Sequence, residues 1–87
     1  MQLNLTSQIW KEGKMYVSYN PELDISTCGR TLNEAKKNLK EAIEAFLEEA
    51  EKMGTLKQIL KESGFVLEKR KWQAPEFLGW ERIPIAI

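Results

Sequence analysis

Histidine is absent from the sequence of 87 residues. This absence excludes Ser-His and Cys-His nucleophile pairs, histidine-ligated metals and the commonest general base of enzymes. The single cysteine, Cys28, cannot form a disulfide within the chain or a cysteine-rich zinc site, which favours a reducing compartment. No apolar run approaches about 18 residues, and the first residues do not resemble a secretion signal. We therefore expect a small cytoplasmic protein that is not an enzyme and holds no metal or cofactor.

Net charge is also absent, because 13 Lys+Arg balance 13 Asp+Glu. A neutral chain has no overall basic field to attract nucleic acid or an anionic membrane non-specifically. Hydrophobic residues make up 43% of the chain and charged residues 30%, which is typical of a folded domain. The length fits one domain, and a chain this short buries only roughly 60–65% of its unfolded surface. We expect modest stability unless the protein oligomerises.

Alternating hydrophobic and polar residues predict strands in the first part of the chain. The alternation runs over residues 3–9 and again over residues 15–19, with a polar break containing a glycine between them. A turn signal, Asn-Pro-Glu at residues 20–22, follows the second strand. Residues 25–28 are rich in β-branched side chains and form a short third strand. The three segments predict antiparallel strands.

Residues 31–53 have the periodicity of a long helix. Thr31 and Glu34 fit a capping box, in which each side chain satisfies a backbone N–H of the other residue. Gly54 stands where a glycine commonly ends a helix. A second start signal and a short helix follow within residues 55–64. The apolar face of the long helix consists of Leu32, Ala35, Leu39, Ala42, Ile43, Phe46, Leu47, Ala50 and Met53.

Two further strands are expected after the helices. Residues 65–72 begin with Phe-Val-Leu, and residues 83–87 alternate isoleucine with proline and alanine. Pro84 confines the last strand to a sheet edge or bulge. The order β-β-β-α-α-β-β predicts an α+β fold, in which one long helix covers one face of an antiparallel sheet. We interpret residues 1–87 as one domain with its core at about residues 3–53.

The carboxylates of Glu22 and Asp24 lie two residues apart and would point to one side of an extended segment. Two carboxylates are too few to define a Mg²⁺ site, and a solvated turn explains them equally well. Cys28 stands near Arg30 and just before the long helix, which is a setting in which redox or nucleophilic thiols occur. Without a histidine to act as base, a half-buried strand cysteine is the favoured interpretation.

The cluster Lys69-Arg70-Lys71-Trp72 resembles a small nucleic-acid patch beside an aromatic platform. On a strand, Lys69 and Lys71 would face one way, and Arg70 and Trp72 the other. The cluster would then be divided between two faces. We favour a basic sheet edge that resists unwanted strand pairing, with nucleic-acid contact through Lys69, Arg70 and Lys71 as the alternative.

Four large aromatic side chains, Trp10, Trp72, Phe77 and Trp80, are many for so short a chain. Trp10 falls on the strand face opposite the apolar residues of the first strand. Aromatic side chains on the second face of a sheet with one helix layer usually mark an interface. We therefore predict a homodimer or tetramer that uses these residues, with packing by residues 72–87 within the chain as the alternative.

Two segments together resemble the HicB family of antitoxins: WKEGKMYVSYNPEL at residues 10–23 and CGRTLNEA at residues 28–35. Family sequences have a hairpin with a Tyr-Val-hydrophobic strand, a Pro-Glu-Leu turn and a Gly-x-Thr-x-x-Glu-Ala helix start. The resemblance covers about residues 3–52. No DNA-binding module of the kind that many family members carry follows this core. The matching positions are Pro21, Glu22, Leu23, Gly29, Thr31, Glu34 and Ala35.

The resemblance implies a partial RNase H-like β-β-β-α-β domain without catalytic activity. It also implies that the chain binds and neutralises a small mRNA-cleaving toxin and assembles as a dimer or tetramer. The hairpin edge at residues 16–24 or the acidic long helix would meet the basic surface of that toxin. A solvated face explains the acidic residues of the helix equally well: Glu41, Glu44, Glu48, Glu49 and Glu51. An oligomeric HicB-like domain without a toxin and a small nucleic-acid-binding protein are the alternatives. The candidate partner-binding residues are Tyr16, Tyr19, Glu22, Asp24, Glu44 and Glu48.

Overall fold

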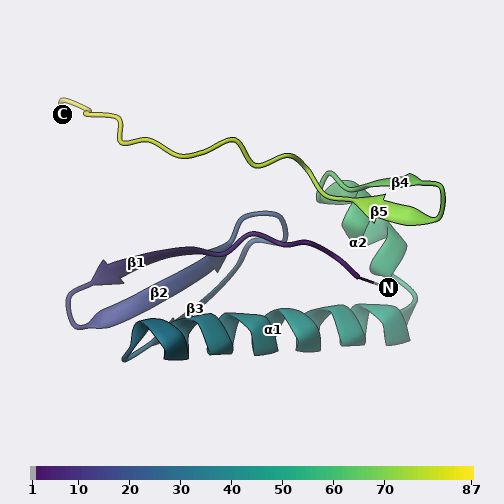
Figure 1. Ribbon diagram of the computed structural model, residues 1–87, viewed down its shortest axis with the longest axis horizontal. Helices are drawn as coiled ribbons and strands as arrows, with labels where there is room; N and C mark the ends of the chain where they lie inside the picture. Colours follow the sequence, from purple (N-terminus) through teal and green to yellow (C-terminus); the bar gives the residue numbers. More distant parts are fainter. Residues whose placement is uncertain (1) are drawn as a thin grey trace.

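A computed structural model describes residues 2–87 (Figure 1). Three strands form an antiparallel sheet in the order β1-β2-β3, and two further strands form a separate antiparallel hairpin. The predicted α+β class and the order β-β-β-α-α-β-β are confirmed. The elements are β1 (Gln8–Glu12), β2 (Met15–Asn20), β3 (Ile25–Gly29), α1 (Leu32–Met53), α2 (Leu56–Glu62), β4 (Val66–Glu68) and β5 (Lys71–Gln73).

The long helix α1 covers one face of the three-stranded sheet and lies mainly against β3 and β2 (Figure 1). On β3, the Thr27 hydroxyl donates a hydrogen bond to the Ala35 carbonyl of α1 at 3.3 Å. The register places Ser18 opposite Thr27, and Ile9 opposite Ser18, so these three residues face α1. Ser18 and Asn20 are fully buried. Polar side chains therefore form much of the layer between sheet and helix.

A glycine allows the sheet to approach α1 closely. Gly29 ends β3, and a Cβ atom added there would lie 2.6 Å from the Ala35 nitrogen and 2.9 Å from the Glu34 carbonyl carbon. The helix begins immediately afterwards, where the Thr31 hydroxyl accepts a hydrogen bond from the Glu34 N–H at 3.0 Å. This half of the predicted capping box is confirmed. The other half is not formed, since the Glu34 side chain accepts no hydrogen bond from the Thr31 N–H, both residues lying in the described part of the chain.

A second small core forms where α1 ends. Gly54 has the predicted left-handed conformation, with φ of 74°, and the chain turns into α2. Ala50, Leu60 and Phe65 are buried together with this turn. Thr55 stands at the start of α2 as predicted, but its hydroxyl makes no cap bond and donates instead to the Ala50 carbonyl at 3.3 Å. The bond ties the start of α2 to the end of α1.

The first predicted strand is too long, since residues 3–7 belong to no sheet and β1 begins at Gln8. The backbone of residues 3–7 is hydrogen-bonded to side chains at and after the end of β2 and not to a neighbouring strand. The Thr6 N–H donates to a Glu22 carboxylate oxygen at 2.8 Å, and the Asn20 amide donates to the Thr6 carbonyl at 2.8 Å. The backbone of the arm (residues 2–7) is thus held by side chains, which periodicity does not reveal.

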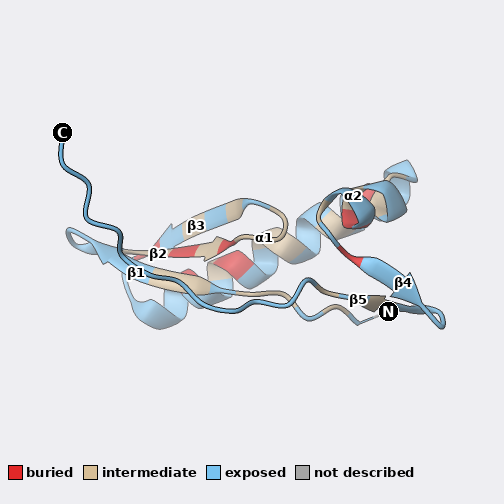
Figure 2. Ribbon diagram, turned by 90° about the horizontal axis from the view of Figure 1, so that it is seen from above, coloured by how far each residue is buried: buried red, intermediate tan, exposed pale blue. Residues whose placement is uncertain are grey.

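The last two strands are also placed differently from the prediction. Residues 65–72 do not form one strand, because the chain reverses at Lys69 and Arg70 to form the β4–β5 hairpin. Residues 83–87 form no strand and have no neighbouring strand to pair with. Figure 2 shows the chain after β5 running exposed to its C-terminal end, and every residue from Pro75 onward is exposed. The RNase H-like part of the prediction stays a prediction.

None of the helices within residues 2–87 combines the length and apolar character that crossing a bilayer requires.

Candidate protein-binding surfaces

The sheet face turned away from α1 carries a row of exposed and half-buried apolar side chains. Trp10, Val17 and Cys28 stand opposite one another across the three strands, and Met15 and Tyr19 flank them on β2. Trp10 and Tyr19 meet edge to face, with ring centroids 6.4 Å apart. We call these five residues the open face. The prediction that Trp10 lies opposite Ile9 is confirmed.

Two carboxylates border the open face and are held by its aromatic residues. The Trp10 indole N–H donates to a Glu12 carboxylate oxygen at 2.9 Å. The Tyr19 hydroxyl donates to an Asp24 carboxylate oxygen at 2.9 Å. Asp24 has φ of 56°, a conformation that aspartate tolerates better than most residues. The open face therefore presents aromatic surface with fixed negative charge beside it.

The hydrogen bond to Asp24 raises the pKa of Tyr19 above its ordinary value of 10.0, and burial and the Asp24 charge act in the same direction. The folded state thus holds the phenol proton more tightly. The resulting stabilisation is present below the unfolded pKa and is lost as the pH rises through the folded pKa. We expect Asp24→Asn to lower the Tyr19 pKa, measured by ultraviolet titration of phenolate in a Tyr16→Phe background. An unchanged midpoint would show that Asp24 does not hold the phenol.

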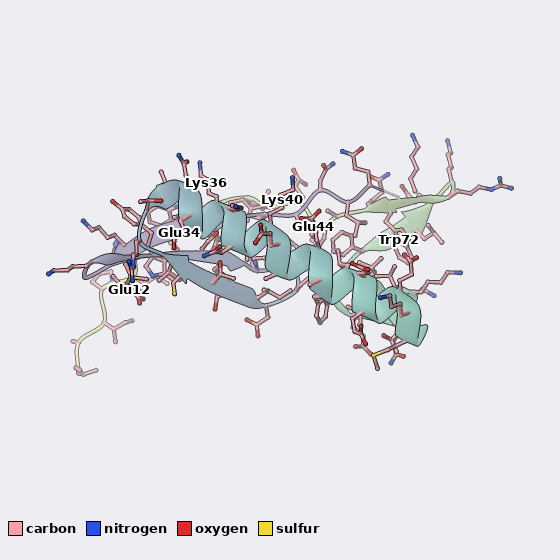
Figure 3. The ribbon with its side chains drawn as sticks, turned by 90° about the horizontal axis from the view of Figure 1, so that it is seen from below. Glu12, Glu34, Lys36, Lys40, Glu44 and Trp72 are labelled. Carbon is pink, nitrogen blue, oxygen red and sulfur yellow. The ribbon has the colours of Figure 1, made fainter. Side chains whose placement is uncertain are left out.

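The chain after β5 passes over the same side of the sheet. Phe77, Trp80 and Arg82 line a cavity of about 610 Å³ together with residues 6–10. Three of the four aromatic residues predicted for an oligomer interface, Trp10, Phe77 and Trp80, therefore gather at one place. Trp72, on β5, lies apart from them. Figure 3 shows it far along the molecule from Glu12, to which Trp10 is hydrogen-bonded.

A second apolar surface lies on the other side of β1. The α1 groove, of about 800 Å³, separates residues 2–9 from α1. Lys36, Lys40 and Glu44, which lie in a row along α1, form part of its rim (Figure 3). Sequence reasoning missed this groove, because it depends on where α1 lies relative to residues 2–9. Its apolar lining consists of Leu3, Leu5, Ile9, Leu39, Ile43, Leu47 and Leu56.

The six predicted partner-binding residues do not form one surface. Tyr19 and Asp24 lie at the open face, whereas Glu44 and Glu48 line the α1 groove. Tyr16 faces α1, with the Lys11 ammonium 5.5 Å from its ring centroid, and the Glu22 carboxylate holds the arm. Two i,i+4 ion pairs form along α1, Lys37–Glu41 (4.0 Å) and Glu48–Lys52 (3.5 Å). Lys40 and Glu44, both at the groove, do not pair.

The carboxylates of Glu22 and Asp24 serve different hydrogen bonds, to the arm and to Tyr19. Nowhere within residues 2–87 do three His, Cys, Asp or Glu side chains come together as metal ligands would. The expectation of a half-buried Cys28 is wrong, because its thiol is exposed on the open face. The alternation of β3 assigns Thr27 to the helix side and Cys28 to the uncovered side.

The basic cluster is not divided between two strand faces as predicted. Lys69 and Arg70 are the two residues of the tight turn between β4 and β5, with φ of 48° and 67°. Positive φ at both positions is the geometry of a two-residue hairpin loop that favours Asn-Gly. Sequence reasoning missed the turn because the loop lacks those residues. All three cations, including Lys71, are exposed at the tip of the hairpin.

No family model matches the chain, and no curated protein or solved structure matches it significantly.

Proposed function

We propose that this chain is a non-enzymatic, HicB-like antitoxin-type protein that acts in the cytoplasm. In this proposal it binds and neutralises a small, basic toxin that cleaves mRNA, and it forms a homo-oligomer. The observation that carries the proposal is the open face, where Trp10 is 40% and Met15 36% exposed on a sheet that no second helix layer covers. Large aromatic anchors with a polar rim are typical of surfaces that bind other proteins.

Charge at the two surfaces supports a basic partner. Glu12 and Asp24 stand at the open face. The α1 groove is lined by three carboxylates, Glu44, Glu48 and Glu51, against two ammonium groups, Lys36 and Lys40. Carboxylates at the rim of a binding surface speed the approach of a basic protein and disfavour acidic competitors. The resemblance of residues 3–52 to HicB antitoxins supplies the class of partner, an RNA-cleaving protein.

The test is capture of the tagged protein from its own host, followed by an RNA-cleavage assay on the captured partner. We expect a stoichiometric, small, basic protein that cleaves RNA when it is freed from this chain and stops when the chain is added back. A partner whose RNA cleavage persists with the chain bound would contradict the proposal. An eluate containing only this chain would contradict it as well.

Within such a complex, we expect Trp10→Ala to weaken binding of the partner by roughly 30-fold or more, because central tryptophans are typical hot spots. The measurement is the Kd by calorimetry with the purified partner. Lys57→Ala, an exposed change on α2, is the matched control and should leave the Kd unchanged. Equal affinity of both variants would remove the open face from the interface.

The hairpin tip favours nucleic-acid binding as a second candidate function. Lys69 and Arg70 occupy turn positions where Asn-Gly is more stable, and strained residues often persist at functional sites. We expect the double change Lys69→Asn, Arg70→Gly to raise the free energy of unfolding by about 1 kcal/mol. If the tip binds RNA or DNA, the same variant should lose the shift seen in a low-salt gel assay. If the unmodified protein gives no gel shift at low salt, nucleic-acid binding is excluded.

A further inference from the structure

The C-terminal segment contains a pattern of apolar residues that its own molecule does not use. Ile83, Ile85 and Ile87 are 67%, 73% and 120% exposed, although they alternate like the inward residues of a strand. Figure 2 shows this segment as exposed over its whole course. We call residues 83–87 the tail strand. Residues 83–87 form no strand within the single molecule, but their alternation is the pattern of a strand that lacks a partner.

One edge of the three-stranded sheet has no hydrogen-bonded neighbour within residues 2–87, and only a cavity of about 610 Å³ separates residues 6–10 from Phe77, Trp80 and Arg82. β1 pairs with β2 on one side, and no strand lies on its other side within residues 2–87. The two-residue loop between Glu12 and Met15 makes these two a hydrogen-bonded pair, and such pairs alternate along the ladder. The N–H and C=O groups of Ile9 and Lys11 therefore point toward the free edge. The side chain of Ile9 faces α1.

The α1 groove lies directly beneath that free edge. It is bounded by Ser7 and Ile9 on one side and by Leu39, Ile43 and Leu47 of α1 on the other. A strand added beside β1 would place every second side chain over this apolar lining. The groove is thus the space that a fourth strand needs for its inward residues. Three isoleucines at alternate positions match its chemistry.

Pro84 selects the direction in which the tail strand can pair. Proline has no N–H, so its backbone must point away from β1, and the backbone groups of Ile83, Ile85 and Ile87 then point toward β1. On β1, residues that point to the free edge have side chains on the α1 face. In an antiparallel neighbour, the residues whose backbone groups point toward β1 also have their side chains on the α1 face. In a parallel neighbour, the residues whose backbone groups point toward β1 have their side chains on the opposite face. Only antiparallel pairing therefore combines an outward Pro84 with isoleucines in the α1 groove.

The tail strand of the same molecule runs the wrong way. Residues 74–87 leave β5 and run in the same direction as β1, on the side of the sheet away from α1 (Figure 1). A second copy related by a two-fold axis perpendicular to the strands presents its tail strand antiparallel to β1. We propose that the tail strand of each copy pairs with β1 of a second copy and fills its α1 groove. The arrangement is symmetric and closed, because each copy gives one strand and receives one.

The register follows from the residues beside β1 that line the α1 groove and from those that point to the free edge. Ile85, the middle isoleucine, is placed opposite Ile9, which does both. Ile83 then lies opposite Lys11, and Ile87 lies opposite Ser7. Pro84 and Ala86 face outward along the new sheet edge, where the missing N–H of Pro84 discourages further strand addition. Exchange thus pairs the free backbone N–H and C=O groups of β1. It also leaves Pro84 on the new outer edge, where further strand pairing is disfavoured.

A matched pair of variants tests the exchange by light scattering on the size-exclusion peak. We expect the unmodified protein to have twice the 10.1 kDa mass of one chain. Ile85→Lys puts a charge into the α1 groove and should give a single chain, whereas Ala86→Lys faces solvent and should leave the dimer intact. A monomeric unmodified protein overturns the proposal. A dimeric Ile85→Lys variant, or loss of the dimer in both variants, overturns it as well.

A crosslink tests the register without depending on how well Ile85→Lys folds. Directly opposite antiparallel residues have Cα atoms about 4.5–5.5 Å apart, within the span of a disulfide. With the exposed Cys28 changed to serine in both, the Ile9→Cys and Ile85→Cys proteins are mixed and oxidised. We expect a disulfide-linked heterodimer on a non-reducing gel. Its absence, or a disulfide only within single chains of the doubly substituted protein, overturns exchange between copies.

Discussion

Replacing Gly29 with alanine should lower the free energy of unfolding by about 3 kcal/mol and the Tm by roughly 10–20 °C. The new Cβ would lie 2.6 Å from the Ala35 nitrogen and 2.9 Å from the Glu34 carbonyl carbon. Both are backbone atoms at the start of α1, so no side-chain rotation relieves the collision. The sheet and α1 must move apart. Thr27, which donates to the Ala35 carbonyl, would lose its hydrogen bond at the same time.

Thermal unfolding followed by circular dichroism measures the effect of Gly29→Ala. Cys28→Ala is the matched control, since it changes the neighbouring residue of β3 on the exposed face. We expect that control to shift the Tm by no more than a few degrees. A Gly29→Ala protein as stable as the control would show that α1 lies farther from β3 than the structure places it.

Features that depend on neighbouring residues could be predicted from the sequence. The helix limits at Thr31 and Gly54 follow from a hydroxyl cap and a left-handed glycine, which are local interactions. The order of the elements follows from two periodicities, 2 and about 3.6, that change where the chain changes structure. The Gly13 turn likewise depends on one residue with φ of 59°. Each of these signals lies within a few residues of the feature it specifies.

Features that depend on distant contacts could not be predicted. The arm alternates like a strand, yet the Asn20 and Glu22 side chains occupy its backbone groups. The tail strand also alternates, but the pattern does not say which edge it pairs with. Periodicity records which side of a segment is apolar and gives no information on its partner. The α1 groove was missed for this reason, because it depends on where α1 lies relative to β1.

The candidate surfaces were predicted in part. The grouping of Trp10 with Phe77 and Trp80 agrees with the aromatic argument, whereas Trp72 was included only because it is aromatic. The acidic residues of α1 are exposed, and no pattern along the chain separates Glu44 at the groove from its neighbours. Distinguishing them requires knowing which helix face the sheet covers.

Replacing Asn20 with alanine should lower the free energy of unfolding by about 2–4 kcal/mol and release the arm from the sheet. Asn20 is fully buried, and its amide donates to the Thr6 carbonyl at 2.8 Å and to the Glu22 carboxylate at 2.7 Å. Its carbonyl accepts from the Leu23 N–H at 2.8 Å. Alanine leaves the Thr6 and Leu23 groups without these partners, and each such buried group costs about 1–3 kcal/mol.

Two readouts separate release of the arm from a general loss of stability. Chemical denaturation gives the free energy, and hydrogen exchange reports the Thr6 and Leu23 amides individually. Asn4→Ala, the same chemical change at an exposed site in the arm, should be nearly neutral in both. We expect Asn20→Ala to speed exchange at Thr6 and Leu23 more than in α2, whose Leu60 lies in the separate core. Equal acceleration at all three places would mean that Asn20 supports the whole fold rather than the arm, because the α2 core shares no hydrogen bond with it.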